Sequence, residues 1–227
     1  WWTDGVLPKY FTDMTPRLYL DIFLPLIQAT DLRRALILMG PRRVGKTVMM
    51  FHSMQKLIES GVPAQNIIYI SVETPIYNKV DLEQLYLLAC QILNKNPRQE
   101  QMYVFYDEVQ YLKDWEVSLK SLVDTYLNVK FIASGSAAAE LKKRSDESGA
   151  GRFTDFHLPP LTFYEYIHLK DYTHIMYPDT NSKLYAKSKL SKNAFEKGKK
   201  KIKGISGCTQ LGDGSIALIL DVAGLKS

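Results

Sequence analysis

One eight-residue stretch constrains the fold of this chain more than any other part of it. Gly40-Pro-Arg-Arg-Val-Gly-Lys-Thr47 fits the pattern G-x-x-x-x-G-K-[ST], and it follows the short apolar run Ala35–Met39. A segment with helical spacing, Thr47–Ser60, comes next and is expected to stop at Gly61. Glycines between a strand and a helix N-terminus let backbone N–H groups wrap a phosphate. The stretch therefore predicts an α/β fold with a phosphate-binding loop after its first strand.

Each position of this loop has an expected role in binding ATP. The Lys46 ammonium is expected to reach the β- and γ-phosphates, and the Thr47 hydroxyl is expected to ligate Mg²⁺. Arg42 and Arg43 could touch the nucleotide or face solvent, and the sequence leaves both open. The simpler alternative is a glycine turn that contains a lysine without function. The full set expected to bind the nucleotide is Gly40, Pro41, Arg42, Arg43, Val44, Gly45, Lys46, Thr47 and Val48.

Two adjacent carboxylates form the second signal. The apolar run Tyr103–Tyr106 delivers Asp107 and Glu108 at its end, which is the Walker B arrangement. Asp107 would hold Mg²⁺, usually through water, and Glu108 would orient and polarise an attacking water molecule. A capped turn is the alternative, since Asp and Glu often begin helices. The adjacent glutamate favours hydrolysis of ATP over a nucleotide switch.

Two weaker signals complete the candidate catalytic set. Ser134 follows another apolar run and could sense the γ-phosphate, and the alternative is a Ser/Gly turn that includes Ser136. Arg152 could stabilise the charge that builds on the transferred phosphoryl group, in the same subunit or in a neighbouring one, with Arg144 as its rival. A solvated arginine before an edge strand is the alternative for Arg152.

The order of the elements predicts a parallel sheet covered by helices on both faces. Continuous apolar runs, typical of strands buried on both sides, alternate with amphipathic helical segments. The predicted strands are Ala35–Met39, Ile67–Val72, Tyr103–Tyr106, Val129–Ala133 and Phe153–Leu158. The predicted apolar helix faces are Ile22, Phe23, Leu26 and Ile27; then, after a cap at Asp81, Leu82, Leu85, Ala89, Ile92 and Leu93; then Trp115, Leu119, Leu122, Val123 and Tyr126. Ligand loops are expected at the carboxyl ends of the strands.

We expect four segments: a lead-in over 1–34, the α/β domain over 35–170, a Lys-rich linker over 171–203, and a β-hairpin over 204–227. Residues 181–203 hold nine lysines and one acid, so this run alone exceeds the chain's net charge of +5. A lysine run is typically a solvated linker, and nucleic acid is a candidate partner only there. The hairpin is expected to pair Ile205–Leu211 with Ser215–Val222. Two strands alone are not stable, so they are expected to pair with something further.

Composition excludes several classes of protein. Cys90 and Cys208 are too few for a disulfide framework or a four-cysteine zinc site, and the four histidines lack metal-ligand spacing. No signal peptide is visible, and no apolar run approaches the roughly 20 residues of a membrane helix. We therefore expect a cytoplasmic protein in a reduced compartment, without a membrane partner. The sequence begins at Trp1 rather than Met, which is typical of a fragment.

The motifs, taken in order, resemble those of a known family. The loop G-P-R-R-V-G-K-T, Tyr106–Gln110, Gly151-Arg152 and Leu158–Tyr166 are similar to motifs of the prokaryotic AAA-type ATPases. The resemblance implies an AAA-type P-loop NTPase sheet with strand order 5-1-4-3-2, binding of ATP and Mg²⁺, and hydrolysis. It carries over the roles of Lys46, Thr47, Asp107 and Glu108, and it places Ser134 at the sensor position. We do not expect the family's usual C-terminal domain in the residues given after 170, because the sequence leaves the family pattern near there.

The tail points elsewhere. Residues 204–225 resemble the last strands of the coupling domain of chemotaxis histidine kinases. A chimeric or truncated reading frame would explain both halves, because neither is complete.

Three hypotheses about function stay open. The first is an ATPase that uses water as the nucleophile, and an arginine supplied by a neighbouring subunit would then make it a homo-oligomer. The second is a nucleotide-binding module without turnover, or a fragment whose tail adds strands to a chemotaxis partner. The third is a P-loop small-molecule kinase, which would need an arginine-rich lid that the sequence does not show.

Overall fold

The computed structural model describes residues 1, 3–77, 80–135, 151–170, 176–178, 184–186, 205–210 and 216–220. The chain forms two compact units, Trp1–Pro160 and Leu161–Ser227. The segment boundaries at residues 34, 170 and 203 stay predictions.

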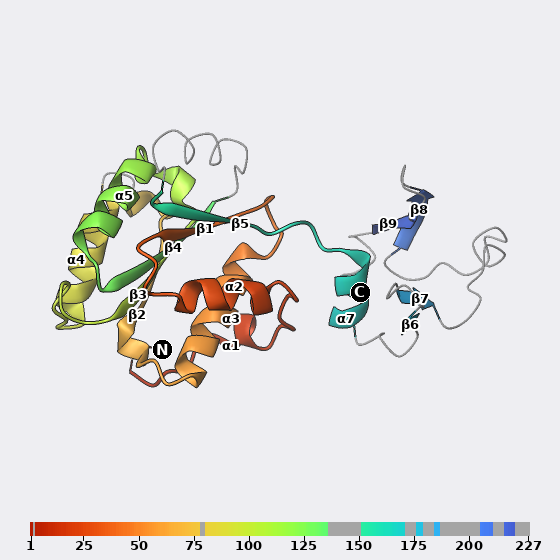
Figure 1. Cartoon of the computed structure of the whole chain (residues 1–227), viewed down its shortest axis with the longest axis horizontal. Coiled ribbons are helices and arrows are strands. Elements are labelled where there is room, and N and C mark those ends of the chain that lie inside the picture. Colours follow the sequence, from red (N-terminus) through yellow and green to blue (C-terminus); the bar gives the residue numbers. More distant parts are fainter. Residues whose placement is uncertain are drawn as a thin grey trace. The chain divides into compact units, whose positions relative to one another are not determined.

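A parallel sheet forms the centre of the first unit. Among the described residues it has five strands in the order β2-β3-β4-β1-β5, and every neighbouring pair is parallel (Figure 1). The strands are β1 (Ala35–Met39), β2 (Ile67–Ser71), β3 (Met102–Asp107), β4 (Val129–Gly135) and β5 (Phe153–His157). Read from the other edge, this is the predicted order 5-1-4-3-2. The predicted fold class is therefore confirmed.

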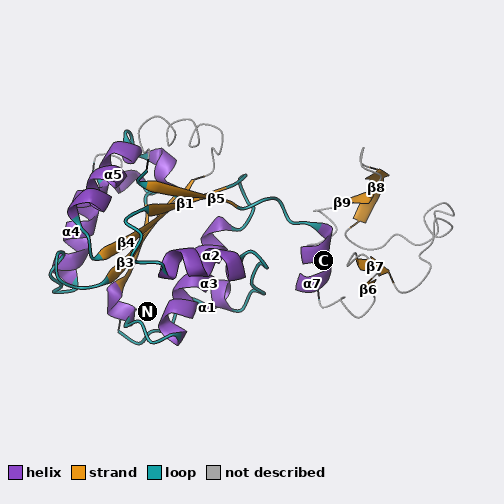
Figure 2. Cartoon of the chain, in the orientation of Figure 1, coloured by secondary structure: helices purple, strands orange, loops and turns teal. Residues whose placement is uncertain are grey.

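Helices cover both faces of the sheet (Figure 2). On one face lie α1 (Lys9–Thr12), α2 (Leu20–Gln28) and α3 (Lys46–Glu59); on the other lie α4 (Leu82–Ile92) and α5 (Trp115–Thr125). Alternate residues of β1 belong to different cores: Leu36 and Leu38 pack with α3, whereas Ile37 and Met39 pack with α4 and α5. All five residues of β1 are buried, which explains why its sequence is continuously apolar rather than alternating.

The helix predictions hold with two corrections. Helix α3 ends with Gly61 in the left-handed region, at φ 97°, and the Asp81 carboxylate caps α4 by accepting from the Gln84 N–H at 2.8 Å. The predicted face of α5 is buried along its length. Ile22 and Ile92, however, were predicted to pack inward and are 61% and 64% exposed. In both helices the buried face is rotated, toward Leu20 in α2 and toward Tyr86 and Cys90 in α4, which are buried instead. Short 3-10 turns lie at Ala64–Asn66, Pro75–Tyr77 and Val109–Tyr111.

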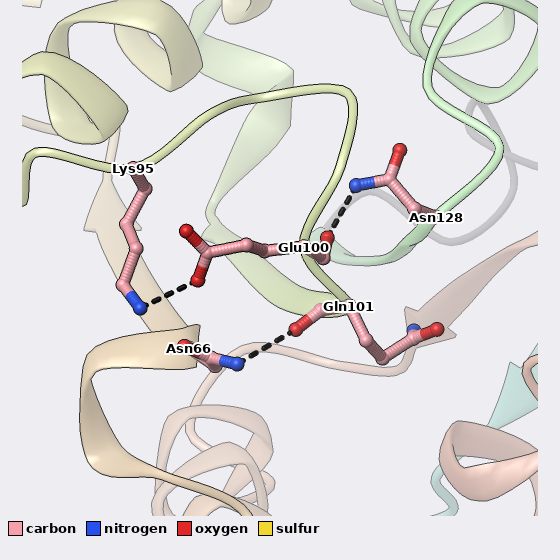
Figure 3. Close-up of polar contacts among 5 residues, drawn as sticks. All are labelled: Asn66, Lys95, Glu100, Gln101 and Asn128. Atoms are coloured by element: carbon pink, nitrogen blue, oxygen red, sulfur yellow. Dashed lines mark hydrogen bonds and ion pairs between the residues drawn. The ribbon is translucent and has the colours of Figure 1, made fainter.

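Polar side chains tie together the loops that enter three strands. Asn66, just before β2, donates its side-chain amide to the Gln101 carbonyl at 3.0 Å, and Asn128, just before β4, donates to the Glu100 carbonyl (Figure 3). The Lys95 ammonium pairs with the Glu100 carboxylate at 2.6 Å. These contacts lie at the amino ends of the strands. They stabilise the edge of the sheet opposite to the one where ligand loops are expected.

The second unit contains one described helix and two small hairpins. Helix α7 (Phe163–Leu169) is capped by Thr162, whose hydroxyl accepts from the Glu165 N–H at 3.2 Å. Strands β6 (Met176–Pro178) and β7 (Leu184–Ala186) pair antiparallel inside the segment predicted as a linker. Strands β8 (Ile205–Gln210) and β9 (Ile216–Leu220) form the antiparallel pair predicted for the tail. Among the helices of the described part, none is both long and apolar enough to cross a membrane.

Candidate active site

The loop between β1 and α3 has a backbone shaped to hold an anion. Arg43 and Gly45 take left-handed conformations, at φ 62° and 97°, and α3 begins directly afterwards at Lys46 with no side-chain cap on its first N–H groups. Those N–H groups and the positive end of the helix are what a phosphate requires. Gly40 has no space for a side chain, because an added Cβ would lie 2.5 Å from the Leu158 carbonyl oxygen.

Exposure differs along the loop. Gly40 and Lys46 are buried; Val44, Gly45, Thr47 and Val48 are half-buried; Pro41, Arg42 and Arg43 are exposed. The Arg42 guanidinium lies 3.5 Å from the Tyr111 hydroxyl. Both arginines therefore lie where solvent or a bound nucleotide could meet them.

The Lys46 side chain folds back over its own loop. Its ammonium donates to the carbonyls of Gly40 at 3.2 Å and Pro41 at 3.0 Å, and only 4% of the residue is exposed. Burial lowers the pKa of Lys46, while the nearby carboxylates of Glu108 and Asp107 oppose that shift. Counting partners in the described part of the chain, this buried ammonium is held by two backbone carbonyls and has a third proton that a phosphate oxygen could accept.

Asp107 joins the two sequence motifs. The Thr47 hydroxyl donates to Asp107 Oδ2 at 2.7 Å across 60 residues of sequence. The Tyr69 hydroxyl donates to the same oxygen at 2.8 Å, and the Ser134 hydroxyl donates to Oδ1. Burial and the Asp107 charge together raise the pKa of Tyr69 far above its usual range, so this phenol remains a donor. Asp107 as a whole is only 2% exposed.

Glu108 follows in an unusual backbone conformation. Its φ of 61° lies in the left-handed region, which is sparsely populated by residues other than glycine. Its N–H donates to the Ser134 hydroxyl at 3.1 Å, and its carboxylate accepts from the Gln110 side-chain amide. Ser134 thus bridges both acidic residues, from the end of the neighbouring strand β4.

The oxygen donors at this edge fit a magnesium site. Mg²⁺ prefers one or two carboxylates together with hydroxyl, phosphate and water oxygens. Thr47 and Asp107 supply a hydroxyl and a carboxylate in contact with each other, beside the helix N-terminus where a phosphate would bind. In the described part of the chain no group of three or more His, Cys, Asp and Glu side chains gathers into an all-protein metal cage. A hard cation shared with phosphate oxygens is the kind that this donor pair suits.

Arg152 lies at the amino ends of the strands, opposite to the ends that carry the phosphate loop. Its carbonyl accepts from the Ala35 N–H at the start of β1, whereas the phosphate loop follows the end of β1, about 16 Å further along a five-residue strand. Its guanidinium pairs with Asp124 on α5 and is 44% exposed. This placement excludes contact between Arg152 and the phosphate loop of the same chain. Arg144 and Ser136 lie outside the described residues.

The family follows from a comparison with known proteins. A family model described as an AAA domain matches residues 32–167, more than half of the chain. The chain belongs to this AAA domain family. The match begins before β1, covers both acidic residues of the site and ends within α7. Membership supports a nucleotide-binding, ATPase-like function for the sheet and its loops.

Two curated relatives of this AAA domain carry names that give no activity. An uncharacterized protein of Haemophilus influenzae is 30% identical over 151 residues, which are 64% of this chain and 36% of that protein. The uncharacterized protein MJ1637 of Methanocaldococcus jannaschii is 30% identical over 142 residues, 61% of this chain and 28% of that protein. The chain thus spans about a third of the length of these relatives.

A solved structure agrees on the fold. The S. cerevisiae Hsp104:casein complex in an extended conformation superposes with a TM-score of 0.50 at 15% identity, covering 71% of this chain and 30% of that one. At this identity the likeness concerns the fold alone. The predicted similarity of the tail to a chemotaxis coupling domain stays a prediction.

Three residues of the AAA domain site were missing from the sequence-based set: Tyr69, Gln110 and Arg17. Tyr69 lies within an apolar strand, but the β2–β3 register places Ser71 opposite Asp107, and Tyr69 shares a face with Ser71. Given the strand order, that register is the signal that would have found it. Gln110 was quoted only as part of a motif.

Arg17 had no local signal. It comes from the lead-in and is 8% exposed. Its guanidinium donates to the Val44 carbonyl at 2.8 Å and to the Pro159 carbonyl at 3.1 Å, so it ties the phosphate loop to the segment after β5. Its partners lie 27 and 142 residues away in sequence, which is why no spacing rule could indicate them.

Proposed function

We propose that this AAA domain binds ATP with Mg²⁺ and hydrolyses it, with Glu108 activating the attacking water. The observation that carries the proposal is the contact between Thr47 and Asp107, with Glu108 on the next residue and held by Ser134. That contact brings the two expected phosphate and metal motifs to one point at the carboxyl edge of the sheet. Neither motif, taken alone, requires the Thr47 hydroxyl and the Asp107 carboxylate to lie in contact.

The chain's own groups divide the work of the proposed reaction. The loop N–H groups and the Lys46 ammonium bind the phosphates, and Lys46 donates the proton that its two carbonyl partners leave free to a phosphate oxygen. Mg²⁺, when bound by Thr47 and Asp107, neutralises charge on the β- and γ-phosphates. The Glu108 carboxylate takes a proton from water as that water attacks the γ-phosphorus, the bond from phosphorus to the β–γ bridging oxygen breaks, and ADP leaves with that oxygen. Gln110 orients the carboxylate. The Ser134 hydroxyl bonds to both Asp107 and Glu108 and so fixes their positions relative to each other.

A role for Arg152 is proposed in a neighbouring subunit. Its position at the far edge of the sheet and its partial exposure support contact with another copy's phosphates rather than its own. Such a contact requires a homo-oligomer in which the β5 edge of one copy faces the phosphate loop of the next.

A reduced, cytoplasmic location is part of the same proposal and rests on cysteine usage.

The experiment that tests the function separates binding from turnover. Phosphate release from ATP is measured with and without Mg²⁺ in the wild-type chain, Lys46→Ala and Glu108→Gln, beside binding of the same nucleotide. We expect Lys46→Ala to lose binding, and Glu108→Gln to bind normally while losing turnover by about 100-fold or more. Binding without release in the wild type would favour a nucleotide-binding module. Phosphate transfer to a small molecule would favour the kinase. No binding at all would favour a truncated or chimeric fragment.

A further inference from the structure

Tyr69 lies outside both sequence motifs and nevertheless contacts the centre of the site. Its ring stands on the edge strand β2, and its hydroxyl reaches Asp107 Oδ2 at 2.8 Å. We propose that Tyr69 is a positioning residue for the magnesium site, which fixes the Asp107 carboxylate so that Oδ1 keeps an acceptor position for a metal-bound water. The inference rests on the proposed function and deepens it.

The acceptor positions of Asp107 carry the argument. An ionised carboxylate offers about four lone-pair positions, two on each oxygen. Thr47 and Tyr69 occupy both positions on Oδ2, and Ser134 occupies one on Oδ1. Counting the donors in the described part of the chain, one position remains, and it is on Oδ1. Because Asp107 is only 2% exposed, bulk water does not compete freely for that position.

Each donor fixes a different feature of the carboxylate. Thr47 comes from α3 and is itself an expected ligand, so its contact fixes Oδ2 beside the phosphate loop. Ser134 comes from β4, on one side of β3. Tyr69 comes from β2, on the other side. Without the Tyr69 hydroxyl, both oxygens would have an open position and the carboxylate could turn about its Cβ–Cγ bond. A correctly oriented ligand is what such outer contacts typically provide to a metal.

The Tyr69 ring is held before any ligand arrives. It packs against Phe51 with ring centroids 4.7 Å apart, and Trp1 meets it edge-on at 6.3 Å. Phe51 in turn stacks on Phe11 at 4.1 Å. These contacts from α3 and from the N-terminal segment fix the Tyr69 ring. The hydrogen bond to Asp107 therefore costs little additional side-chain entropy. The arrangement is preorganised rather than induced.

The test removes the hydroxyl and keeps the ring. Tyr69→Phe is compared with the wild type and with Tyr103→Phe, the same chemical change on the adjacent strand β3, where the hydroxyl is not among the donors to Asp107. Binding of a fluorescent ATP analogue is titrated with Mg²⁺, and binding in EDTA and the thermal midpoint of each variant are measured beside it. We expect Tyr69→Phe to need about tenfold more Mg²⁺ for half-maximal binding, with binding in EDTA unchanged. Tyr103→Phe is expected to follow the wild type.

The outcomes separate this inference from the proposed function. A magnesium requirement equal in Tyr69→Phe and wild type, or raised equally in both tyrosine variants, overturns the positioning role while the ATPase proposal stands. A loss of binding in EDTA as well would show a general effect on the fold of the loop and would also overturn it. If the wild type binds no nucleotide under either condition, the proposed function fails and the inference fails with it.

Discussion

Gly40 shows how one missing side chain decides the shape of the site. The Leu158 amide donates to the Met39 carbonyl at 2.7 Å, and the Leu158 carbonyl oxygen then lies where a Cβ of residue 40 would be. Because the neighbouring atom belongs to the backbone, no side-chain rotation relieves the clash. The start of the phosphate loop and the segment after β5 therefore have to move apart together if any other residue stands there.

We predict that Gly40→Ala lowers the free energy of unfolding by about 1–3 kcal/mol and weakens nucleotide binding. Gly61→Ala is the matched control. A Cβ added there would meet nothing within 4 Å, so only the unfavourable φ of 97° should lower the stability, by about 1 kcal/mol. Urea denaturation and nucleotide titration of both variants measure the difference. Equal losses of stability, with binding intact in both, would show that the close approach to Leu158 does not matter.

At the scale of elements, α3 is held from the N-terminal side by a buried histidine. His52 Nε2 lies 2.9 Å from the carbonyl of Phe11, in the helix α1, and the side chain is almost fully buried. Burial is the main cause that lowers the pKa of His52, and the Lys56 charge adds to it, against the hydrogen bonds to the lead-in. The neutral imidazole donates to that carbonyl and thereby ties α1 to the helix that follows the phosphate loop.

This lowered pKa predicts a loss of stability in acid. Above the unfolded pKa of about 6.5 the imidazole is neutral in both states, so the contribution is complete there. As pH falls below that value, the unfolded chain takes up the proton first, and stability is lost until the folded pKa is also passed. Thermal midpoints between pH 7.5 and 5 should fall more steeply for the wild type than for His52→Gln, whose amide can donate without titrating. Parallel pH profiles would contradict this assignment.

The elements were largely predictable from sequence, and their side-chain partners were not. Continuous apolar runs indicated the inner strands β1 and β3, because burial on both faces leaves no room for polar residues, whereas the edge strand β5 is partly exposed and carries polar side chains. The rotations at Ile22 and Ile92 depend on which neighbour each helix meets, which local periodicity does not contain. The contacts of Arg17 and Tyr69 depend on the order of the strands and on the path of residues 1–34, and neither can be read from local sequence. Arg152 precedes an edge strand, as the sequence indicated. It lies where the strands begin, however, and so it cannot reach the phosphate loop of its own chain, which lies where they end.

At the scale of the whole molecule, the chain is an AAA domain joined to a short second unit. The domain spans about a third of its relatives' length, so the task that hydrolysis would drive belongs to the proposals rather than to the family match. The site nevertheless brings Lys46, Thr47, Asp107, Glu108 and Ser134 to one edge of the sheet. The role proposed for Arg152 in a second copy would require an assembly of such chains. Turnover that rises more steeply than protein concentration, and that falls in Arg152→Ala, would be the signature of such an assembly.

The central claim is that ATP bound at this site is converted to ADP through Glu108. The most direct measurement is a single turnover: protein in excess is loaded with radiolabelled ATP, Mg²⁺ is added, and the bound nucleotide is recovered and separated over time. We predict that the wild type returns ADP and phosphate while Glu108→Gln returns intact ATP from an equally occupied site. ADP formed at the same rate in both proteins, or intact ATP recovered from both, would contradict the account.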